Sequence, residues 1–333
     1  VITNNGSIIL KGTNTVSYGI HSEFGTMEAI TNNGLIKAES NYSYGIRNAG
    51  NNATIIGTLT NTGVIYGKTN AVYNADGTIN NFNNYGLLIS GSTNVVDGIS
   101  IEAYNDAGGQ NKIKNYGLAF TVDSSGNYKN HGASNVNHNF GETQDATIDG
   151  VAYKIRNVEA DVNSTNGAIT NIKSFKIEGG KLYSDTTEIT DGYSTTSNVI
   201  LNGITNILVV SGEGNELNNS IVNAYKTAIA MNENMTTLTL NNTTANGGVK
   251  DSTVNIEGNR NTLTIQGDSI INSSDKAIII TGNNNAVTLE GNTVVNGKME
   301  SIGSNTLNLY GKTDDKNTKL FSLFLSITDK LAK

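Results

Sequence analysis

A motif of asparagine, any residue, glycine and then apolar residues recurs along the first third of this 333-residue chain. Its glycines follow one another at steps of 28, 29, 23 and 31 residues, at Gly6, Gly34, Gly63, Gly86 and Gly117. A second element begins seven or eight residues after each of the first four glycines, at Asn14, Asn41, Asn70 and Asn94. Two linked motifs that keep their spacing across four copies indicate a solenoid, in which each repeat forms one turn of the chain.

The last third of the chain carries a second repeat. Residues 258–272 read GNRNTLTIQGDSIIN and residues 282–296 read GNNNAVTLEGNTVVN, in register at a step of 24. Apolar and polar residues alternate in both copies, which is typical of half-buried strands. We therefore predict an all-β chain that folds as a right-handed parallel β-helix. Asparagines of successive turns are expected to form amide ladders, and glycine or asparagine to occupy corners that need left-handed backbone.

The composition narrows the function classes. The chain has 53 asparagines and 37 glycines but no proline, and a parallel ladder needs the N–H donors that proline lacks. Cysteine is also absent, which excludes disulfides, thiolate metal sites and cysteine nucleophiles. The net charge of −7 disfavours nucleic acid as a partner. Leucine-rich and helical repeats are excluded because their sequence frameworks are missing before about residue 316.

Asn-Asn-Gly-x-Ile followed by Ser-Tyr-Gly-Ile, in a chain without proline or cysteine, resembles the passenger domains of the large fusobacterial autotransporter adhesins. The resemblance is clearest over residues 1–120 and extends over residues 200–311. In that family a signal peptide, a β-helical passenger and an outer-membrane β-barrel translocator follow in that order, and the passenger is displayed outside the cell. The resemblance implies a fragment, without its translocator, that lies at the bacterial cell surface.

The same resemblance implies the partners. Members of the family attach to galactose-type sugars or to host receptors such as the inhibitory immune receptor TIGIT, so a host cell-surface protein or a galactose-type glycan is expected here. We expect a monomer, because the head repeats of trimeric adhesins are missing. The lack of cysteine agrees with export, since a chain that crosses the outer membrane as an extended thread cannot carry disulfides.

The regularity of the repeat divides the chain. β-Helix repeats are expected over residues 1–120, irregular turns with insertion loops over 121–200, and further repeats over 201–315. Apolar residues at 320, 324, 327 and 331 have helical spacing, which predicts a short C-terminal helix or cap over 316–333. Because short hydrophobic segments are spread evenly, we expect one continuous body.

The irregular region 121–200 is the first candidate for binding. Insertions in solenoids lie on one face as loops and often make the specific contacts, although degenerate turns with longer corners are the alternative. The candidate ligand-binding residues are Tyr128, His131, His138, Phe140, Tyr153 and Arg156. The two histidines have no evident third ligand, so neither a metal site nor a cofactor is expected.

Two tyrosines of the repeat form a second candidate. Tyr18 and Tyr44 occupy equivalent positions 26 residues apart, which predicts a stacked ladder. The ladder is interpreted as packing between turns, with a sugar-binding stripe as the alternative.

Three functions stay open on the sequence. The leading hypothesis is a non-catalytic surface adhesin whose loops contact a host protein or glycan. A polysaccharide-processing β-helical lyase or glycosidase is the alternative, with Glu159 and Asp161 as the best acids, expected on one face of an alternating segment. A purely structural stalk is the third.

Overall fold

The computed structural model describes residues 1–12, 16–49, 54–75, 77–91, 104–106, 113–122, 128–129, 141–162, 169–191, 196–249 and 251–311. The chain divides into two compact units. Unit 1 comprises Val1–Asn139 and Asp161–Thr170, and unit 2 comprises Phe140–Ala160 and Asn171–Lys333. This differs from the single continuous body expected from the even spread of hydrophobic residues, because each unit closes around a hydrophobic cluster of its own.

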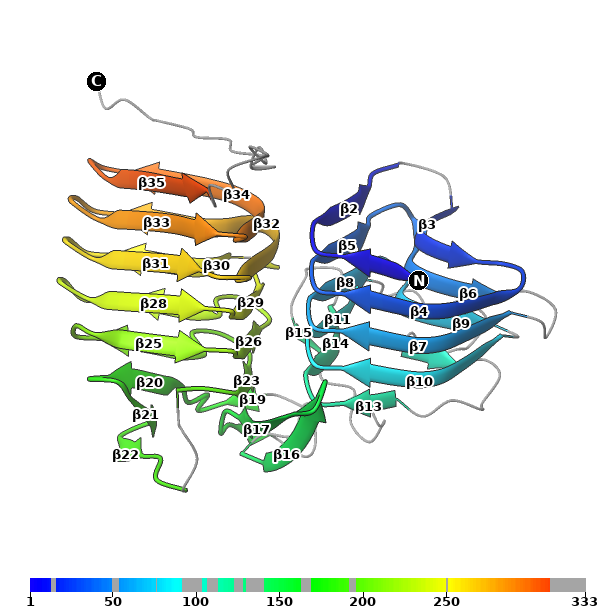
Figure 1. The fold of residues 1–333 in the computed structure, drawn as a ribbon, viewed down its shortest axis with the longest axis horizontal. Coiled ribbons are helices and arrows are strands. Elements are labelled where there is room, and N and C mark those ends of the chain that lie inside the picture. Colours follow the sequence, from blue (N-terminus) through cyan, green and yellow to red (C-terminus); the bar gives the residue numbers. More distant parts are fainter. Residues whose placement is uncertain are drawn as a thin grey trace. The chain divides into compact units, whose positions relative to one another are not determined.

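Unit 1 is a coil in which each turn contributes a strand to each of three parallel sheets (Figure 1). The first sheet contains β1 (Ile2–Asn4), β4 (Thr26–Asn32), β7 (Ile55–Asn61), β10 (Thr78–Asn84) and β13 (Ile113–Asn115). The second contains β2 (Ser7–Leu10), β5 (Leu35–Ala38), β8 (Val64–Gly67), β11 (Leu87–Ser90) and β14 (Leu118–Val122), with β15 (Tyr128–Lys129) antiparallel to β14. The third contains β3 (Val16–Ser22), β6 (Tyr42–Ala49), β9 (Asn70–Ala75) and β12 (Tyr104–Asp106).

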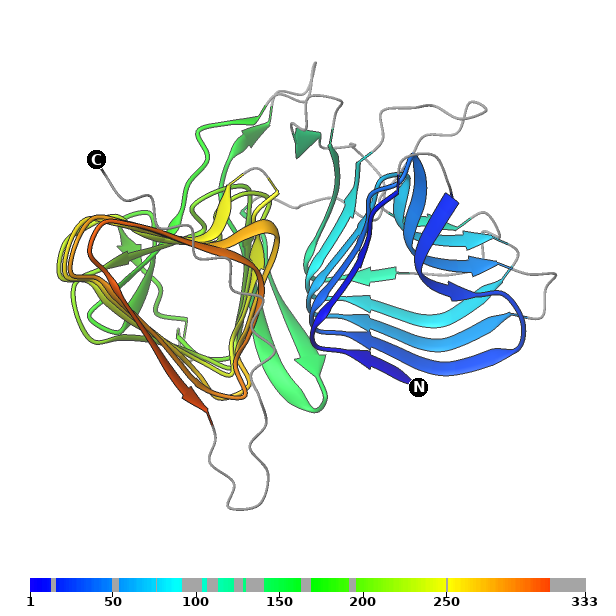
Figure 2. The same ribbon diagram turned by 90° about the horizontal axis from the view of Figure 1, so that it is seen from above.

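Unit 2 is also built from three stacked columns of parallel strands, and its turns superimpose in a three-sided outline (Figure 2). One column contains β17 (Val151–Asn157), β23 (Val199–Gly203), β26 (Ile221–Ala224) and β29 (Thr244–Gly247). Another contains β20 (Phe175–Glu178), β24 (Leu208–Ser211), β27 (Ile229–Met231) and β30 (Ser252–Glu257). The long strands β32 (Ile270–Thr281) and β34 (Val294–Ile302) extend both columns. The third contains β25 (Asn215–Asn218), β28 (Thr237–Asn241), β31 (Thr262–Gln266), β33 (Ala286–Gly291) and β35 (Thr306–Gly311).

Short antiparallel strands occur where the repeat is irregular. In unit 2, β16 (Thr143–Ile148) pairs with β17, and β21 (Lys181–Ser184) and β22 (Thr187–Glu188) extend the sheet from β20. In unit 1, β18 (Asp161–Val162) pairs with β19 (Ile169–Thr170). Within the described ranges there is no helix with the length and hydropathy needed to span a bilayer. The helix or cap predicted over 316–333 lies outside the described residues.

The strand register confirms the predicted repeats. The motif asparagines pair across turns, as Asn32 with Asn61 and Asn61 with Asn84. In unit 2 the predicted step of 24 places Leu263 opposite Val287. The predicted parallel β-helix is therefore confirmed in both units, while its right hand stays a prediction.

The core of each unit consists of aliphatic columns that run through the turns. In unit 1, the inward residues of successive strands, such as Ile36, Ile65 and Leu88, are fully buried. In unit 2, Leu238, Leu263 and Val287 form a comparable column. Each turn thus buries its apolar face against its neighbours, which a single turn cannot do.

Buried asparagines stack beside these columns and bond from turn to turn, as predicted. In unit 1, Asn4, Asn32, Asn61, Asn84 and Asn115 form a ladder whose amide–amide distances are 2.8, 2.8, 2.7 and 2.6 Å. In unit 2, a ladder with distances of 3.0, 2.8, 2.8, 2.9 and 2.8 Å joins Asn157, Asn202, Asn223, Asn246, Asn272 and Asn296. Amide donors also reach backbone carbonyls, as in the 3.3 Å bond from Asn84 to Gly86 O. The buried amides of these two ladders therefore have hydrogen-bond partners, whereas the buried Oδ1 atoms of Asn48 and Asn198 have none among the described residues.

The corner glycines of unit 1 serve a different purpose from the one predicted. None of Gly34, Gly63, Gly86 and Gly117 has left-handed backbone. A Cβ atom on Gly63 would instead lie 2.1 Å from the carbonyl oxygen of Gly34 in the preceding turn, and the other three meet the same obstacle. The left-handed explanation is wrong for these corners and correct in unit 2, where Asn242, Asn284 and Gly267 have positive φ.

We predict that Asn84→Ala lowers the free energy of unfolding by about 2–4 kcal/mol, because it leaves buried partners of the ladder unbonded. Asn81 is the matched control, since it lies exposed in the same strand β10. Asn81→Ala is expected to change stability by less than about 0.5 kcal/mol. Urea unfolding followed by circular dichroism measures both, and equal effects of the two variants would contradict a stabilising role of the ladder.

We also predict that Gly63→Ala is more damaging than Gly6→Ala. The new methyl group at position 63 would overlap the Gly34 carbonyl, whereas a Cβ on Gly6 meets no atom within 4 Å. The expected loss is more than about 3 kcal/mol for Gly63→Ala and less than about 0.5 kcal/mol for Gly6→Ala. Thermal unfolding compares them, and a Gly63→Ala variant as stable as the parent protein would refute the close-approach explanation.

Candidate functional site

Three tyrosines stack on the outer face of the sheet that contains β3, β6 and β9. The ring centroids of Tyr18 and Tyr44 lie 5.9 Å apart and those of Tyr44 and Tyr73 lie 5.0 Å apart, with interplanar angles of 26° and 28°. All three side chains are partly exposed. The predicted ladder of Tyr18 and Tyr44 is confirmed, and the structure adds Tyr73 to it.

The Tyr-Gly-Ile sequence that begins at Tyr18 and again at Tyr44 explains why the residue three positions after each tyrosine lies on the same outer face. A Cβ on Gly19 would lie 2.4 Å from Ile36 Cγ2, so Gly19 faces the interior, as does the buried Ile20 that follows it. Two successive inward residues interrupt the strand alternation. Tyr18 and His21 therefore both point outward, and their ring centroids are 4.4 Å apart.

Arg47 lies beside these rings. Its Cζ atom is 5.0 Å from the centre of the Tyr18 ring, within the range of a cation–π contact. Its Nη1 lies 2.8 Å from Nε2 of His21. Because an arginine can only donate, Nε2 of His21 accepts this bond, which requires a neutral imidazole with its proton on Nδ1. Burial, and secondly the Arg47 charge, lower the pKa of His21, in agreement with the neutral form.

The exposed apolar surface continues along the same strands. Val16 and Tyr42 are paired across β3 and β6, and they are 52% and 53% exposed. Burial raises the pKa of Tyr44, with Tyr73 as the next cause, so its hydroxyl stays protonated at neutral pH. We call this outer face the tyrosine patch, defined by Val16, Tyr18, His21, Tyr42, Tyr44, Arg47 and Tyr73.

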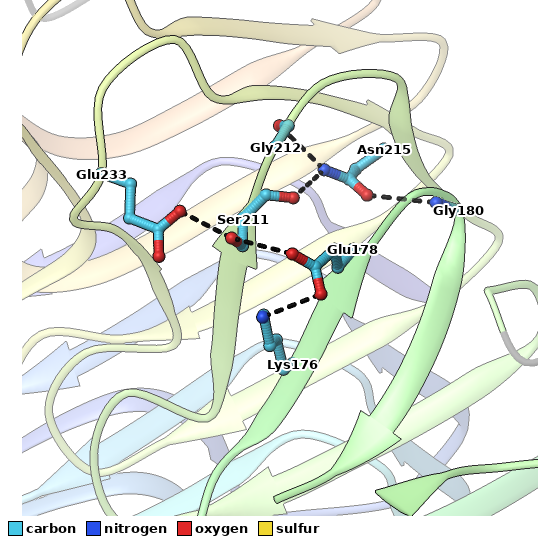
Figure 3. Close-up of polar contacts among 7 residues, drawn as sticks. All are labelled: Lys176, Glu178, Gly180, Ser211, Gly212, Asn215 and Glu233. Atoms are coloured by element: carbon cyan, nitrogen blue, oxygen red, sulfur yellow. Dashed lines mark hydrogen bonds and ion pairs between the residues drawn. The ribbon is translucent and has the colours of Figure 1, made fainter. Parts of the chain in front are cut away.

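A second polar cluster lies in unit 2, where the stacked strands β20, β24 and β27 end (Figure 3). The hydroxyl of Ser211 donates to Glu233 at 2.6 Å and lies 3.4 Å from Glu178 Oε1. Lys176 forms an ion pair of 2.9 Å with Glu178. One hydroxyl thus brings two carboxylates together, and we call Glu178 and Glu233 the glutamate pair.

The backbone around the glutamate pair is held by Asn215. Its amide donates to the carbonyls of Ser211 and Gly212 at 2.9 and 3.1 Å, and its Oδ1 accepts from Gly180 N at 3.2 Å (Figure 3). Asn215 is itself buried. It therefore fixes the strand ends that carry Glu178 and Ser211.

Paired carboxylates are the residues that hydrolyse glycosides, but one of them must be a protonated acid with a raised pKa. Lys176, by its hydrogen bond and then its charge, lowers the pKa of Glu178. Glu178 is therefore ionised and suited to a base or nucleophile, not to an acid. In the part of the chain that the structure describes, no group of three or more histidines and acidic residues is placed to hold a metal ion.

Two of the residues predicted to bind a ligand are described with their side chains. Tyr153 is half-buried in β17, and burial raises its pKa. Arg156 is buried and forms an ion pair with Asp191, so its charge is neutralised within unit 2. The structure places these two side chains in one strand, and their role in binding stays a prediction.

The other predicted residues are not brought together with them. Tyr128 lies in β15, while its side chain, His131, His138 and Phe140 are outside the described residues. Glu159 precedes β18 and belongs to unit 2, whereas Asp161 begins β18 and belongs to unit 1. The prediction that Glu159 and Asp161 share one face of an alternating strand is therefore wrong, because only Asp161 lies in a strand.

The sequence analysis missed His21, Arg47 and Tyr73 as members of one site. A signal was present, since each follows the apolar residue of the second repeat element, at Ile20, Ile46 and Val72. The glutamate pair had no comparable signal, because its members are 55 residues apart in turns of unequal length.

Comparison with protein-family models, with curated proteins and with solved structures finds no match to this chain. The function proposed below therefore rests on the two clusters and on the resemblance seen in the sequence.

We predict that His21 titrates with a pKa below 6.5, its ordinary value. Arg47→Gln should move this pKa upward but not fully, because burial is the larger cause and stays in place. Because the pKa of His21 is lower in the folded state, the unfolded state takes up its proton first as the pH falls. The free energy of unfolding therefore decreases as the pH falls through the ordinary histidine range. Histidine NMR titration, with His21→Gln to assign the signal, measures the shift. A His21 pKa at or above 6.5 would contradict the predicted lowering by burial and Arg47.

Proposed function

We propose that this chain is a non-catalytic bacterial surface adhesin of the autotransporter passenger type that binds a host glycan through the tyrosine patch. The observation that carries the proposal is the row of three stacked, partly exposed tyrosines on unit 1. Because the rings stack on one another, they present their edges outward, and apolar ring edges beside polar hydroxyls suit the C–H and hydroxyl groups of a sugar. The galactose-type glycan that the family resemblance implies belongs to this ligand class.

The β-helix supports such a role because it fixes the rings before a ligand arrives. Each ring comes from a different turn, and the backbone of these turns is paired along β3, β6 and β9. Little side-chain freedom is then lost on binding, which favours affinity. A host cell-surface protein is the other partner implied by the resemblance, and tyrosine and arginine are also enriched at protein–protein interfaces.

The glutamate pair favours a second candidate, a polysaccharide-processing enzyme. Two neighbouring carboxylates on stacked turns are the groups that this chemistry uses. The ion pair with Lys176 keeps Glu178 ionised, so Glu233 would have to be the acid that this chemistry needs. A purely structural stalk, the third possibility, is expected to have uniformly polar outer faces, which the tyrosine patch does not fit.

We expect the full chain to bind oligosaccharides on a glycan array and Tyr44→Ala to bind them at least about tenfold more weakly, a loss of about 1.4 kcal/mol. Tyr310→Ala is the matched control, because Tyr310 is an exposed tyrosine of unit 2, 58% accessible, outside the patch. Circular dichroism checks that both variants fold.

Each other outcome has a definite meaning. Equal binding by the parent protein and Tyr44→Ala would place recognition elsewhere and contradict the proposal. Cleavage of a bound oligosaccharide that is lost in Glu233→Gln would favour the enzyme instead. Binding to no glycan would reject a glycan adhesin.

A further inference from the structure

We propose that the tyrosine patch takes a carboxylated sugar, with Arg47 pairing to the carboxylate while the outer edges of the stacked tyrosine rings contact the sugar. This inference rests on the proposed function and adds the charge class of the ligand to it. The evidence for it is the position of one cation, Arg47, beside the stacked tyrosine rings.

The charge of Arg47 is not neutralised by a neighbouring acid. Its contacts are the Tyr18 ring and the neutral His21, and no carboxylate among the described residues lies within ion-pair distance of it. By contrast, Arg156 is paired with Asp191, and Lys37 and Lys154 also have carboxylate partners. Arg47 is therefore a cation of the patch whose charge has no ion-pair partner among the described residues.

The contacts of Arg47 also orient it. The bond to His21 and the contact with the Tyr18 ring hold the guanidinium at the patch from two directions. The His21 bond uses one of its five N–H donors, so the remaining donors can bind a planar carboxylate through two parallel bonds. A lysine could provide the charge but not this geometry.

The rings explain why the ligand is a sugar and not a small anion. The stacked rings, with the exposed Val16 and Tyr42 of the same strands, form an apolar surface too long for a small anion to cover. Arg47 lies in the middle strand β6, opposite His21 of β3 and Tyr73 of β9. The cation is therefore central in the patch, with tyrosine rings of all three strands beside it.

The test compares matched pairs of oligosaccharides that differ in one carboxylate, such as oligogalacturonides with galactan oligosaccharides and sialyllactose with lactose. Binding of each to the full chain is measured by isothermal titration calorimetry. We expect the parent protein to bind at least one carboxylated member about ten- to a hundredfold more tightly than its neutral partner. Arg47→Gln should abolish this preference, and Arg47→Lys should retain part of it.

Two further variants give the controls. Arg260→Gln removes an exposed arginine of unit 2 and should leave the preference unchanged. Tyr73→Ala should weaken the binding of carboxylated and neutral sugars by similar factors, because it removes stacking and not charge. Circular dichroism confirms the fold of each variant.

The outcomes separate this inference from the proposed function. Equal affinity for neutral and carboxylated sugars, or a preference that survives in Arg47→Gln, overturns the inference while the glycan adhesin stands. Binding of inorganic phosphate or of an acidic peptide as tightly as of the carboxylated sugar also overturns it, since the patch would then be a general anion site. Binding of no sugar overturns both.

Discussion

The amide ladder is the interaction on which the rest of this structure depends. Hydrophobic columns alone would allow one turn to slip along its neighbour, because aliphatic contacts are non-directional. A buried asparagine that misses its partner leaves a donor and an acceptor unsatisfied, which costs far more than a small packing change. The unbroken bonds from Asn4 to Asn115 and from Asn157 to Asn296 therefore set the register of both units.

A fixed register determines which side chains meet on the outside. The strand register places Tyr44 opposite Tyr18 and Arg47 opposite His21, and a further amide bond of 2.7 Å joins Asn48 to Asn74 in the same sheet. The tyrosine patch is thus assembled on paired strands, and no loop is needed to hold it. The glutamate pair arises in the same way, since Glu178 lies opposite Ser211 in the register of β20 and β24.

The sequence was informative wherever one turn repeats another. The Asn-x-Gly motif and the step of 24 predicted the β-helix, and the equivalence of Tyr18 and Tyr44 predicted their stacking. The division into two units was not predicted, because short apolar strands look alike on either side of the boundary. The reason for glycine at position 63 could not be predicted either. The sequence does not distinguish a glycine required by a nearby carbonyl from a glycine required by a positive φ. The proximity of Glu178 and Glu233 could not be predicted, because it depends on how the residues between them are divided into turns.

The turns differ in length although their asparagines remain paired. The paired asparagines are 28, 29, 23 and 31 residues apart in unit 1, and 21, 23, 26 and 24 residues apart over the regular turns of unit 2. An insertion between two ladder positions therefore lengthens one connection and leaves every other turn in place. Unequal genetic recombination would have a similarly local effect. A crossover between two Asn-x-Gly corners adds or removes one whole turn of the coil. Each remaining turn then still contributes an asparagine to the amide ladder.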